Sequence, residues 1–165
     1  MINAGSSSIK VTLYKESQVV SEAQTNGDAS ESLVRDLGVW IDENVADKEL
    51  VAVGHRIVHG GGKFSETTLL DETTLEDLRP LVTLDSEHLP LALTIIDEVT
   101  NRFPGVPQIA CFDTGFFQNL PRTAQIIPLP REYESIGLRK YGFHGLAYQS
   151  VLHTLSEEYS VDVAS

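Results

Sequence analysis

The chain has 165 residues, of which 41% are hydrophobic and 22% are charged. A chain of this length can bury enough apolar surface to fold as one domain without disulfides or a structural metal, which excludes disordered and disulfide-rich classes. The 24 acidic residues against 12 basic ones give a formal net charge of −12, so we expect neither nucleic acid nor a membrane as a partner. Cys111 is the single cysteine, and no apolar run approaches the roughly 20 residues of a membrane-spanning helix, so we expect a soluble protein in the reducing cytoplasm.

The first 23 residues are predicted to form extended structure. Ile9, Val11 and Leu13 alternate with more polar neighbours, which is the two-residue period of a strand with one buried face. Between Ile2 and Ile9 lie only small residues, 3–8, which are typical of a tight turn. This pattern predicts a strand, a polar turn and a returning strand.

From residue 28 onward the period changes to three and four residues. It predicts a helix over 28–45 that begins at a capping arrangement of Asp28 and Glu31. The continuous apolar run 50–53 then predicts a strand buried on both faces, which ends before the polar, glycine-rich segment 54–62. Two further helices are predicted, over 73–78 and over 91–102.

The second half of the chain begins with another predicted strand, 108–112, and Asp113 directly follows it. A proline-rich passage comes next, with one or two helical turns over 131–136. The last helix begins near Gly145, and we expect its inward face to consist of Val151, Leu152, Leu155 and Tyr159. This order of elements predicts an α/β domain with a mixed sheet.

The turn at residues 3–10 is a candidate anion site. Its small side chains let backbone N–H groups approach an anion closely, its serines add hydroxyl donors, and Lys10 adds a positive charge. The spacing differs from that of a P-loop. A plain hairpin turn is the alternative, and on turn chemistry alone it is the more common one.

Four segments, in their order and spacing, resemble the signatures of the acetate kinase family: Asn3-Ala4-Gly5-Ser6-Ser7-Ser8-Ile9-Lys10, Gly54-His55-Arg56-Ile57-Val58-His59-Gly60-Gly61, Phe112-Asp113-Thr114 and Arg139-Lys140-Tyr141-Gly142-Phe143-His144-Gly145. That family belongs to the sugar kinase, Hsp70 and actin superfamily, whose two lobes are ribonuclease H-like. The resemblance implies an α/β lobe with a mixed five-stranded sheet flanked by helices. Because the family's chains are more than twice as long, residues 1–165 would form a single amino-terminal lobe, and the second lobe would be absent from this chain.

The resemblance also implies an activity, which is ATP- and Mg-dependent phosphoryl transfer to a short-chain carboxylate. Acetate would be converted reversibly to acetyl phosphate, and this chain would supply half the active site. Such catalysis consists mainly of positioning and of stabilising negative charge on the transferred group. Half a cleft cannot enclose ATP, so we expect the isolated chain to be weakly active or inactive.

The resemblance assigns catalytic roles to Arg56, His144 and Asp113. Arg56 would bind the carboxylate and phosphoryl groups, since a guanidinium can hold either through two parallel hydrogen bonds. His144 would stabilise the transition state. Asp113 matches the family's proposed proton donor or acceptor, but a carboxylate substrate is already ionised at neutral pH, so we expect Asp113 to organise Mg²⁺ and its waters. The structural alternatives are a surface salt bridge for Arg56, a cap or a buried hydrogen-bonded histidine for His144, and a turn cap for Asp113.

The remaining expected contacts also follow from the resemblance. Asn3 would contact Mg²⁺, and the ATP contacts would be Lys10, Ser8 and Gly5. The substrate contacts would be Arg56, Val58, His88 and Phe143. A zinc site built from His55, His59, His88 and Asp113 is improbable, because a strand places His55 and His59 on one side without converging them.

Departures from the family favour an alternative function. Only Met1 and Ile2 precede the turn, Gly62 stands where the family has an acid, Glu87 stands where the family has an apolar residue, and Phe117 replaces a histidine. The chain would then be a truncated, non-catalytic relative that acts as a self-associating or binding module. In that case the face normally covered by the second lobe would be unusually apolar.

Overall fold

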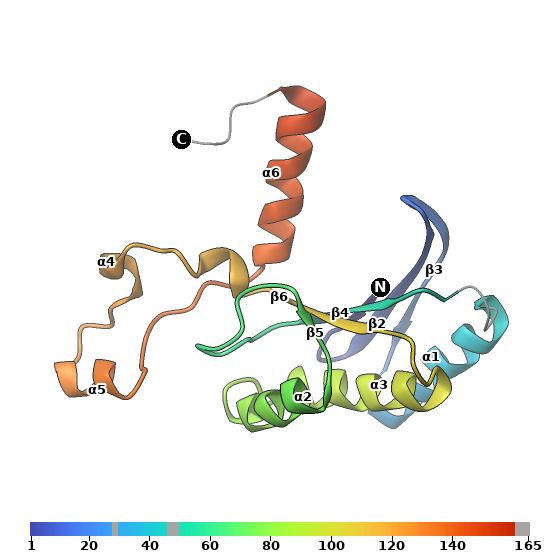
Figure 1. Cartoon of the computed structure of the whole chain (residues 1–165), viewed down its shortest axis with the longest axis horizontal. Helices are drawn as coiled ribbons and strands as arrows, with labels where there is room; N and C mark the ends of the chain where they lie inside the picture. The colour runs from blue at the N-terminus through green and yellow to red at the C-terminus, as the bar shows by residue number, and fades with distance from the viewer. Residues whose placement is uncertain (28–29, 46–49, 161–165) are drawn as a thin grey trace.

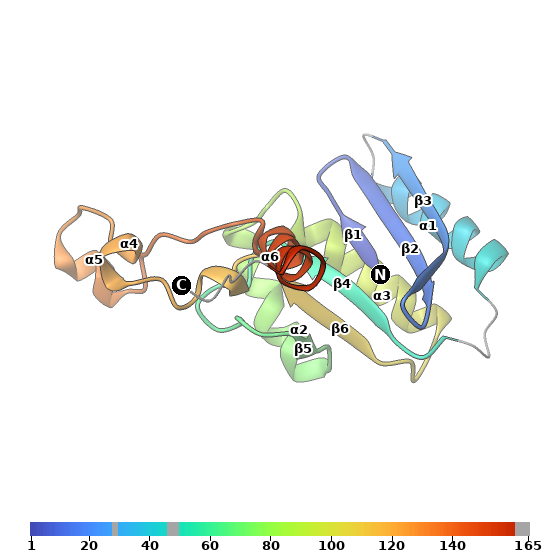
Figure 2. The same ribbon diagram turned by 90° about the horizontal axis from the view of Figure 1, so that it is seen from above.

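The computed structural model describes residues 1–27, 30–45 and 50–160 and contains a six-stranded mixed sheet, ordered β3-β2-β1-β4-β6-β5 (Figures 1 and 2). The strands are β1 (Ile2–Ala4), β2 (Ser8–Lys15), β3 (Gln18–Asn26), β4 (Val53–Ile57), β5 (Thr68–Leu69) and β6 (Gln108–Phe112). The predicted α/β lobe with a mixed sheet and flanking helices is confirmed. The sheet has six strands rather than five because the two-residue β5 adds an antiparallel edge, which is too short for an alternating pattern to reveal.

The amino-terminal hairpin forms as its sequence predicts. β1 pairs antiparallel with β2 and parallel with β4, so it lies in the middle of the sheet. The turn between β1 and β2 is closed by the Gly5 amide, which donates to the Ser8 carbonyl at 2.8 Å. β2 then continues into β3 through a turn in which Glu16 has a φ of 55°.

Helices α1 (Ser30–Asn44) and α3 (Leu89–Arg102) lie along one face of the sheet (Figure 1). The predicted cap at Asp28 falls outside the described residues. α2 (Glu72–Leu78) and the 3₁₀ helix η1 (Arg79–Thr83) precede α3, and the Asp71 side chain caps α2 by accepting a 2.8 Å hydrogen bond from the Thr74 amide. The three predicted helices over 28–45, 73–78 and 91–102 therefore correspond to α1, α2 and α3.

The hydrophobic core lies between the sheet and these helices. Its fully buried members include Ile9 from β2, Leu37 from α1, and Ile95 and Ile96 from α3. Full burial of such a side chain contributes about 1.5–3 kcal/mol. Every buried member of this core lies between Ile2 and Phe112, so the described residues 113–160 add none to it.

The predicted strand at 50–53 was wrong in its position. Val51 is 83% exposed, and β4 begins only at Val53. Along β4, Val53, His55 and Ile57 face the helices, while Arg56 faces the other side of the sheet. The apolar run 50–53 did not reveal the true position of β4, because the buried face of this strand includes the polar residue His55.

The segment after β6 leaves the sheet. It contains the 3₁₀ helix η2 (Gly115–Phe117), α4 (Arg122–Gln125), α5 (Arg131–Ser135) and α6 (Gly145–Tyr159). Figure 1 shows α4 and α5 projecting away from the sheet, and α6 standing on the side opposite α1 and α3. Within the described ranges, no helix combines the length and hydropathy that crossing a membrane requires.

The predicted inward face of α6 was also wrong. Val151 is 56% exposed and Tyr159 is 68% exposed, Leu152 and Leu155 are partly exposed, and Gly145 is the one buried residue of this helix. An apolar stripe indicates that a helix face is suited to burial, but it does not show that this chain supplies the covering surface.

Candidate active site

Three neighbouring strands bring Asn3, Arg56 and Asp113 into direct contact. Asn3 on β1 lies beside Arg56 on β4, and Asp113 follows the end of β6. Arg56 donates to Asp113 Oδ2 from Nε at 3.0 Å and from Nη2 at 2.5 Å, and it donates to Asn3 Oδ1 from Nη1 at 2.9 Å. The ion pair is largely buried, since the Arg56 side chain is 21% exposed and that of Asp113 is 2% exposed.

This arrangement holds the guanidinium in one orientation and still leaves it donors. A guanidinium has five N–H groups, and the three bonds to Asn3 and Asp113 leave one on each terminal nitrogen. Those two N–H groups can hold a carboxylate or phosphate oxygen. The salt-bridge alternative for Arg56 is thus realised, but within a buried pair rather than at the surface.

The register of the sheet extends the site into a row of side chains. Lys10 lies opposite Asn3, Asn3 lies opposite Arg56, and Arg56 lies opposite Cys111. Directly opposed residues of neighbouring strands project from the same face, which is here the face opposite α1 and α3. Lys10 is half exposed and lies 3.6 Å from Glu22 of β3. The predicted cations thus share one face of the sheet.

His55 supports the row from the opposite face. Its Nε2 lies 2.7 Å from Gln108 Oε1, and Gln108 donates to the Thr100 hydroxyl at 2.7 Å. Burial lowers the pKa of His55 to about 4, against the opposing effect of the Gln108 hydrogen bond. His55 is therefore a neutral, structural histidine, and it anchors β4 next to Arg56.

The glycine-rich segment after β4 positions a second group of rings. His59 is 5% exposed, and its Nδ1 accepts a 2.8 Å hydrogen bond from the Gly61 amide. Its ring packs edge-on against Tyr141 at 4.5 Å and Phe143 at 5.7 Å between centroids. Burial lowers the pKa of His59, while the nearby Asp85 charge raises it.

His144 lies beside Asp113 at the start of α6. The next residue, Gly145, donates its amide to the Asp113 carbonyl at 2.9 Å, and a Cβ at Gly145 would come within 2.2 Å of that oxygen. His144 is exposed and has a φ of 61°, in the left-handed region that is unfavourable for a non-glycine residue. Residues in this region cluster at functional sites, and the backbone of His144 is held next to Asp113 by the Gly145 hydrogen bond.

The other residues that the sequence predicts as substrate or ATP contacts lie outside the bonded set of Asn3, Arg56 and Asp113. Val58 follows β4 directly and is half-buried. His88 donates from Nδ1 to Asp85 at 2.9 Å, and the charge of Asp85 also acts on His59. The Gly5 amide is already bonded to Ser8, so that donor is not directed at an anion. Glu87, which stands where the family has an apolar residue, is exposed to solvent.

Asp85 is a residue that the sequence analysis missed. The sequence does contain a signal for it. Asp85 stands three residues before His88, just ahead of a helix whose second residue is a proline, and aspartate is common at such a helix start.

The donor set fits a Mg²⁺ ion that is held largely by a nucleotide. Asn3 and Asp113 offer the amide and carboxylate oxygens that Mg²⁺ prefers. Both oxygens already accept from Arg56, and the described residues contain no group of three acidic, histidine or cysteine side chains that could hold a metal. Mg²⁺ usually binds through one or two carboxylates together with substrate phosphates and water, and these residues suit that arrangement.

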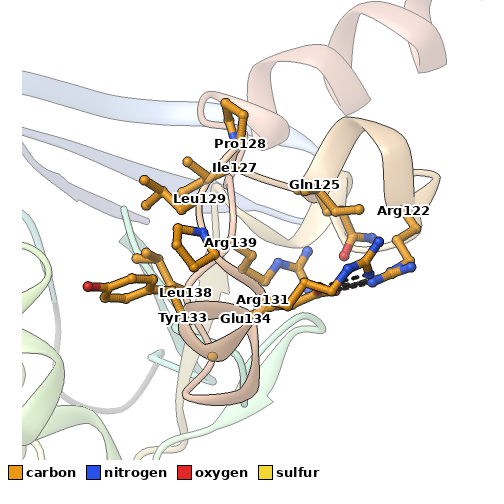
Figure 3. A pocket seen from close by; sticks show the side chains of 13 residues that line it. Arg122, Gln125, Ile127, Pro128, Leu129, Arg131, Tyr133, Glu134, Leu138 and Arg139 are labelled. Atoms are coloured by element: carbon orange, nitrogen blue, oxygen red, sulfur yellow. Dashed lines mark hydrogen bonds and ion pairs between the residues drawn. The ribbon is translucent and has the colours of Figure 1, made fainter.

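The two main hollows lie away from this site. One, of about 240 Å³, lies in the projecting α4–α5 segment, where Arg122 donates to both carboxylate oxygens of Glu134 at 2.8 Å (Figure 3). The other, of about 750 Å³, lies between Met1, the end of β2 and the helices α1 and α3. Arg56 and Asp113 line neither hollow.

Comparisons with known proteins agree on one family. The model described as the acetokinase family matches residues 28–162. The acetate kinase of Acetivibrio thermocellus is 46% identical over 110 residues, which cover 66% of this chain and 28% of that protein. The acetate kinase of Rhodopseudomonas palustris is 32% identical over 95% of this chain and 47% of its own length.

Solved structures show the same similarity. A propionate kinase from Francisella tularensis superposes with a TM-score of 0.82 at 27% identity, covering 98% of this chain and 48% of that one. The acetate kinase of Porphyromonas gingivalis gives a TM-score of 0.78 at 26% identity, with the same coverage of both chains. This chain spans less than half the length of each of these four relatives.

Proposed function

This chain belongs to the acetokinase family, and on that premise we propose that it supplies half of the active site of an acetate kinase-like phosphotransferase. A carboxylate oxygen of a short-chain acid such as acetate attacks the γ-phosphorus of ATP, and the bond from that phosphorus to the bridging oxygen of ADP breaks. The products are an acyl phosphate and ADP, and the reaction is reversible. The observation that carries the proposal is the bonded set of Asn3, Arg56 and Asp113 that three neighbouring strands bring together.

Arg56 supplies the central charge. Its two free N–H groups bind oxygens of the carboxylate and of the transferred phosphoryl group, whose negative charge is spread over three equatorial oxygens. Asp113 and Asn3 hold the guanidinium in place before the substrates arrive, so little reorganisation accompanies the reaction.

Asp113 acts by position and charge rather than as a general base. The substrate carboxylate is ionised at neutral pH and has no proton to give. Two N–H groups of Arg56 already occupy Asp113 Oδ2. When bound, Mg²⁺ neutralises part of the charge on the β- and γ-phosphates, and Asn3 and Asp113 would contact it or its waters.

The other residues complete the half-site. Lys10 lies in the same row as Asn3 and directs its ammonium to the ATP phosphates. His144 donates a hydrogen bond to an equatorial oxygen from its exposed position at the start of α6. Val58 and Phe143 flank the acyl chain, and His88 binds the carboxylate. We place this reaction in the cytoplasm, where the free Cys111 stays reduced.

The exposed apolar face of α6 supports the need for a second half. Tyr148, Val151 and Tyr159 are each more than half exposed, at 54%, 56% and 68%. We infer that residues outside this chain cover this face and close the cleft over the nucleotide. Without them water is not excluded from the reacting groups, so the isolated chain turns over slowly or not at all.

The same exposed face favours a second candidate function, that of a non-catalytic module. Here α6 of one copy packs against α6 of another, and the lobe persists as a self-associating relative. Apolar contact of this kind predicts a dimer in sedimentation velocity experiments. A strict monomer at concentrations of about 100 μM, where a dimer with a Kd of about 1 μM would be almost fully formed, would contradict this function.

A two-lobed hybrid tests the phosphotransferase proposal. In this hybrid, the chain is joined to the carboxyl-terminal half of the Acetivibrio thermocellus acetate kinase. We expect it to form acyl phosphate from ATP, Mg²⁺ and acetate, detected as the hydroxamate, while each half alone gives little or none. A folded hybrid that forms no acyl phosphate from acetate, propionate or butyrate would refute the proposal.

A further inference from the structure

Asp85 is a buried carboxylate that the proposed reaction does not yet use. It lies between η1 and α3 and is 8% exposed. Its Oδ1 accepts two hydrogen bonds from His88, one from the backbone amide at 3.1 Å and one from the ring Nδ1 at 2.9 Å. Its Oδ2 is buried without a hydrogen-bond partner among the described residues. A single carboxylate oxygen thus holds both the backbone amide and the ring of His88, the residue that precedes α3.

The ring contact fixes where His88 carries its proton. An ionised carboxylate can only accept hydrogen bonds, so His88 Nδ1 must be the donor. A neutral imidazole has one N–H group, and His88 Nε2 is then an acceptor with a free lone pair. Nε2 donates a hydrogen bond only when the ring becomes an imidazolium ion.

Asp85 also acts on a residue next to a proposed substrate contact, Phe143. Asp85 also acts electrostatically on His59, whose ring packs on Phe143. The charged and titratable groups that the described contacts bring to His88 are therefore Asp85 and, through it, His59, while its neighbour Glu87 is exposed. Among the described residues, the contact of Asp85 Oδ1 with His88 is thus the one side-chain hydrogen bond that this carboxylate makes.

We propose that Asp85 is a positioning residue, which holds His88 with Nδ1 protonated and presents Nε2 to the substrate carboxylate. This inference rests on the proposed role of His88 in binding that carboxylate. With Nδ1 held by Asp85, a substrate carboxylate can accept a hydrogen bond from Nε2 only when the ring is an imidazolium ion, and that hydrogen bond is then charge-assisted.

The first test is spectroscopic and uses the chain alone. Long-range ¹H–¹⁵N correlation at pH 8 distinguishes the two neutral tautomers of an imidazole. We expect the Nδ1–H tautomer for His88 in the unaltered chain, and observation of the Nε2–H tautomer there would overturn the inference without any variant. This measurement does not require enzymatic activity, so it stands even if the proposed phosphotransferase function fails.

Two matched variants assign the effect to the carboxylate. Asp85→Ser keeps a residue that can cap a helix but is too short to hold the ring, and we expect it to change the His88 tautomer to Nε2–H. Asp71→Ser removes the equivalent capping carboxylate from α2, where Asp71 accepts from Thr74 and no histidine is attached. It should leave the His88 tautomer unchanged. A His88 spectrum that is the same in Asp85→Ser and in the unaltered chain would overturn the inference.

The second test uses the pH profile of the two-lobed hybrid. With Asp85 present, we expect the KM for acetate to rise as the pH is raised, because the neutral Nδ1–H ring cannot donate from Nε2. Asp85→Ser should flatten this rise and leave kcat within about twofold, because the transferred group contacts Arg56 and His144 instead. Equal KM profiles in the two proteins would contradict the inference, and a silent hybrid would refute only the proposed function.

Discussion

The buried His55 makes the stability of this chain sensitive to mild acid. His55 is 2% exposed, and its ring bonds to Gln108 in a place that disfavours the charged form. Burial lowers its pKa from 6.5 to about 4. Below pH 6.5 the unfolded state therefore binds a proton more readily than the folded state does. The stability contributed by neutral His55 is fully present above pH 6.5 and is lost progressively as the pH falls from 6.5 to about 4.

The size of the effect follows from the two pKa values. A shift from 6.5 to about 4 lowers the free energy of unfolding by about 2 kcal/mol between pH 7 and pH 5, and by about 3 kcal/mol in total below pH 4. That is a large part of the stability of a small domain, which is typically about 5–15 kcal/mol. Burial lowers the pKa of His59 as well, so a comparison with a His55 variant is needed to isolate one ring.

Urea unfolding at pH 7 and pH 5 measures this contribution. His55→Gln keeps hydrogen-bonding groups beside Gln108 but cannot titrate, and we expect its loss of stability between the two pH values to be about 2 kcal/mol smaller than that of the unaltered chain. His153→Gln is the control, because His153 is exposed on α6 and should leave the pH dependence unchanged. Equal losses in His55→Gln and in the unaltered chain would refute this account of His55.

Three further predictions concern the ion pair, the helix start and the exposed face. Asp113→Ala should lower the free energy of unfolding by about 3 kcal/mol, because it leaves the largely buried Arg56 without its ion-pair partner. Asp97→Ala removes an exposed ion pair and should lower it by less than about 1 kcal/mol. Equal costs in urea unfolding would contradict this. Gly145→Ala should lower the midpoint of urea unfolding, since its Cβ would collide with the Asp113 carbonyl, and an unchanged midpoint would show that α6 does not start against that oxygen. Val151→Asp should weaken any self-association seen in sedimentation velocity, while Val39→Asp, at an exposed site on α1, should not; equal effects would show that the α6 face is not the contact.

Local patterns were enough to predict most elements of the lobe. The alternation around Ile9 and the small residues at 3–8 predicted a strand, a turn and a strand, and β1 and β2 form there. The three- and four-residue periods over 28–45 and 91–102 predicted α1 and α3. These predictions succeed because each depends on contacts between residues close in sequence or on one continuous face.

The errors arose where burial depends on distant parts of the chain. The apolar run 50–53 was predicted to be a buried strand, but only its last residue joins β4. The apolar stripe of α6 was predicted to be core, but no described residue of this chain covers Val151 or Tyr159. β5 consists of two residues and exists through its pairing with β6, which no local period indicates.

The candidate site shows the same division. Resemblance to the family indicated Asn3, Arg56 and Asp113, but their direct bonding depends on the register of β1 against β4 and of β4 against β6. Asn3 and Arg56 are separated by 53 positions in the sequence, and no local pattern indicates that they become neighbours in adjacent strands. Asp85 was missed because its role depends on the side-chain rotamer of His88 rather than on a motif.

The kinetics of one conservative substitution test the central claim most directly. In the two-lobed hybrid, Arg56→Lys keeps the positive charge but removes the planar fork that Asp113 and Asn3 orient. We predict that kcat/KM for acetate falls by about a hundredfold or more in Arg56→Lys. Arg35→Lys, at an arginine whose side chain is 73% exposed, should keep the rate of the unaltered hybrid. A folded Arg56→Lys hybrid that forms acetyl phosphate as fast as the Arg35→Lys control would contradict the proposal that Arg56 holds the reacting groups.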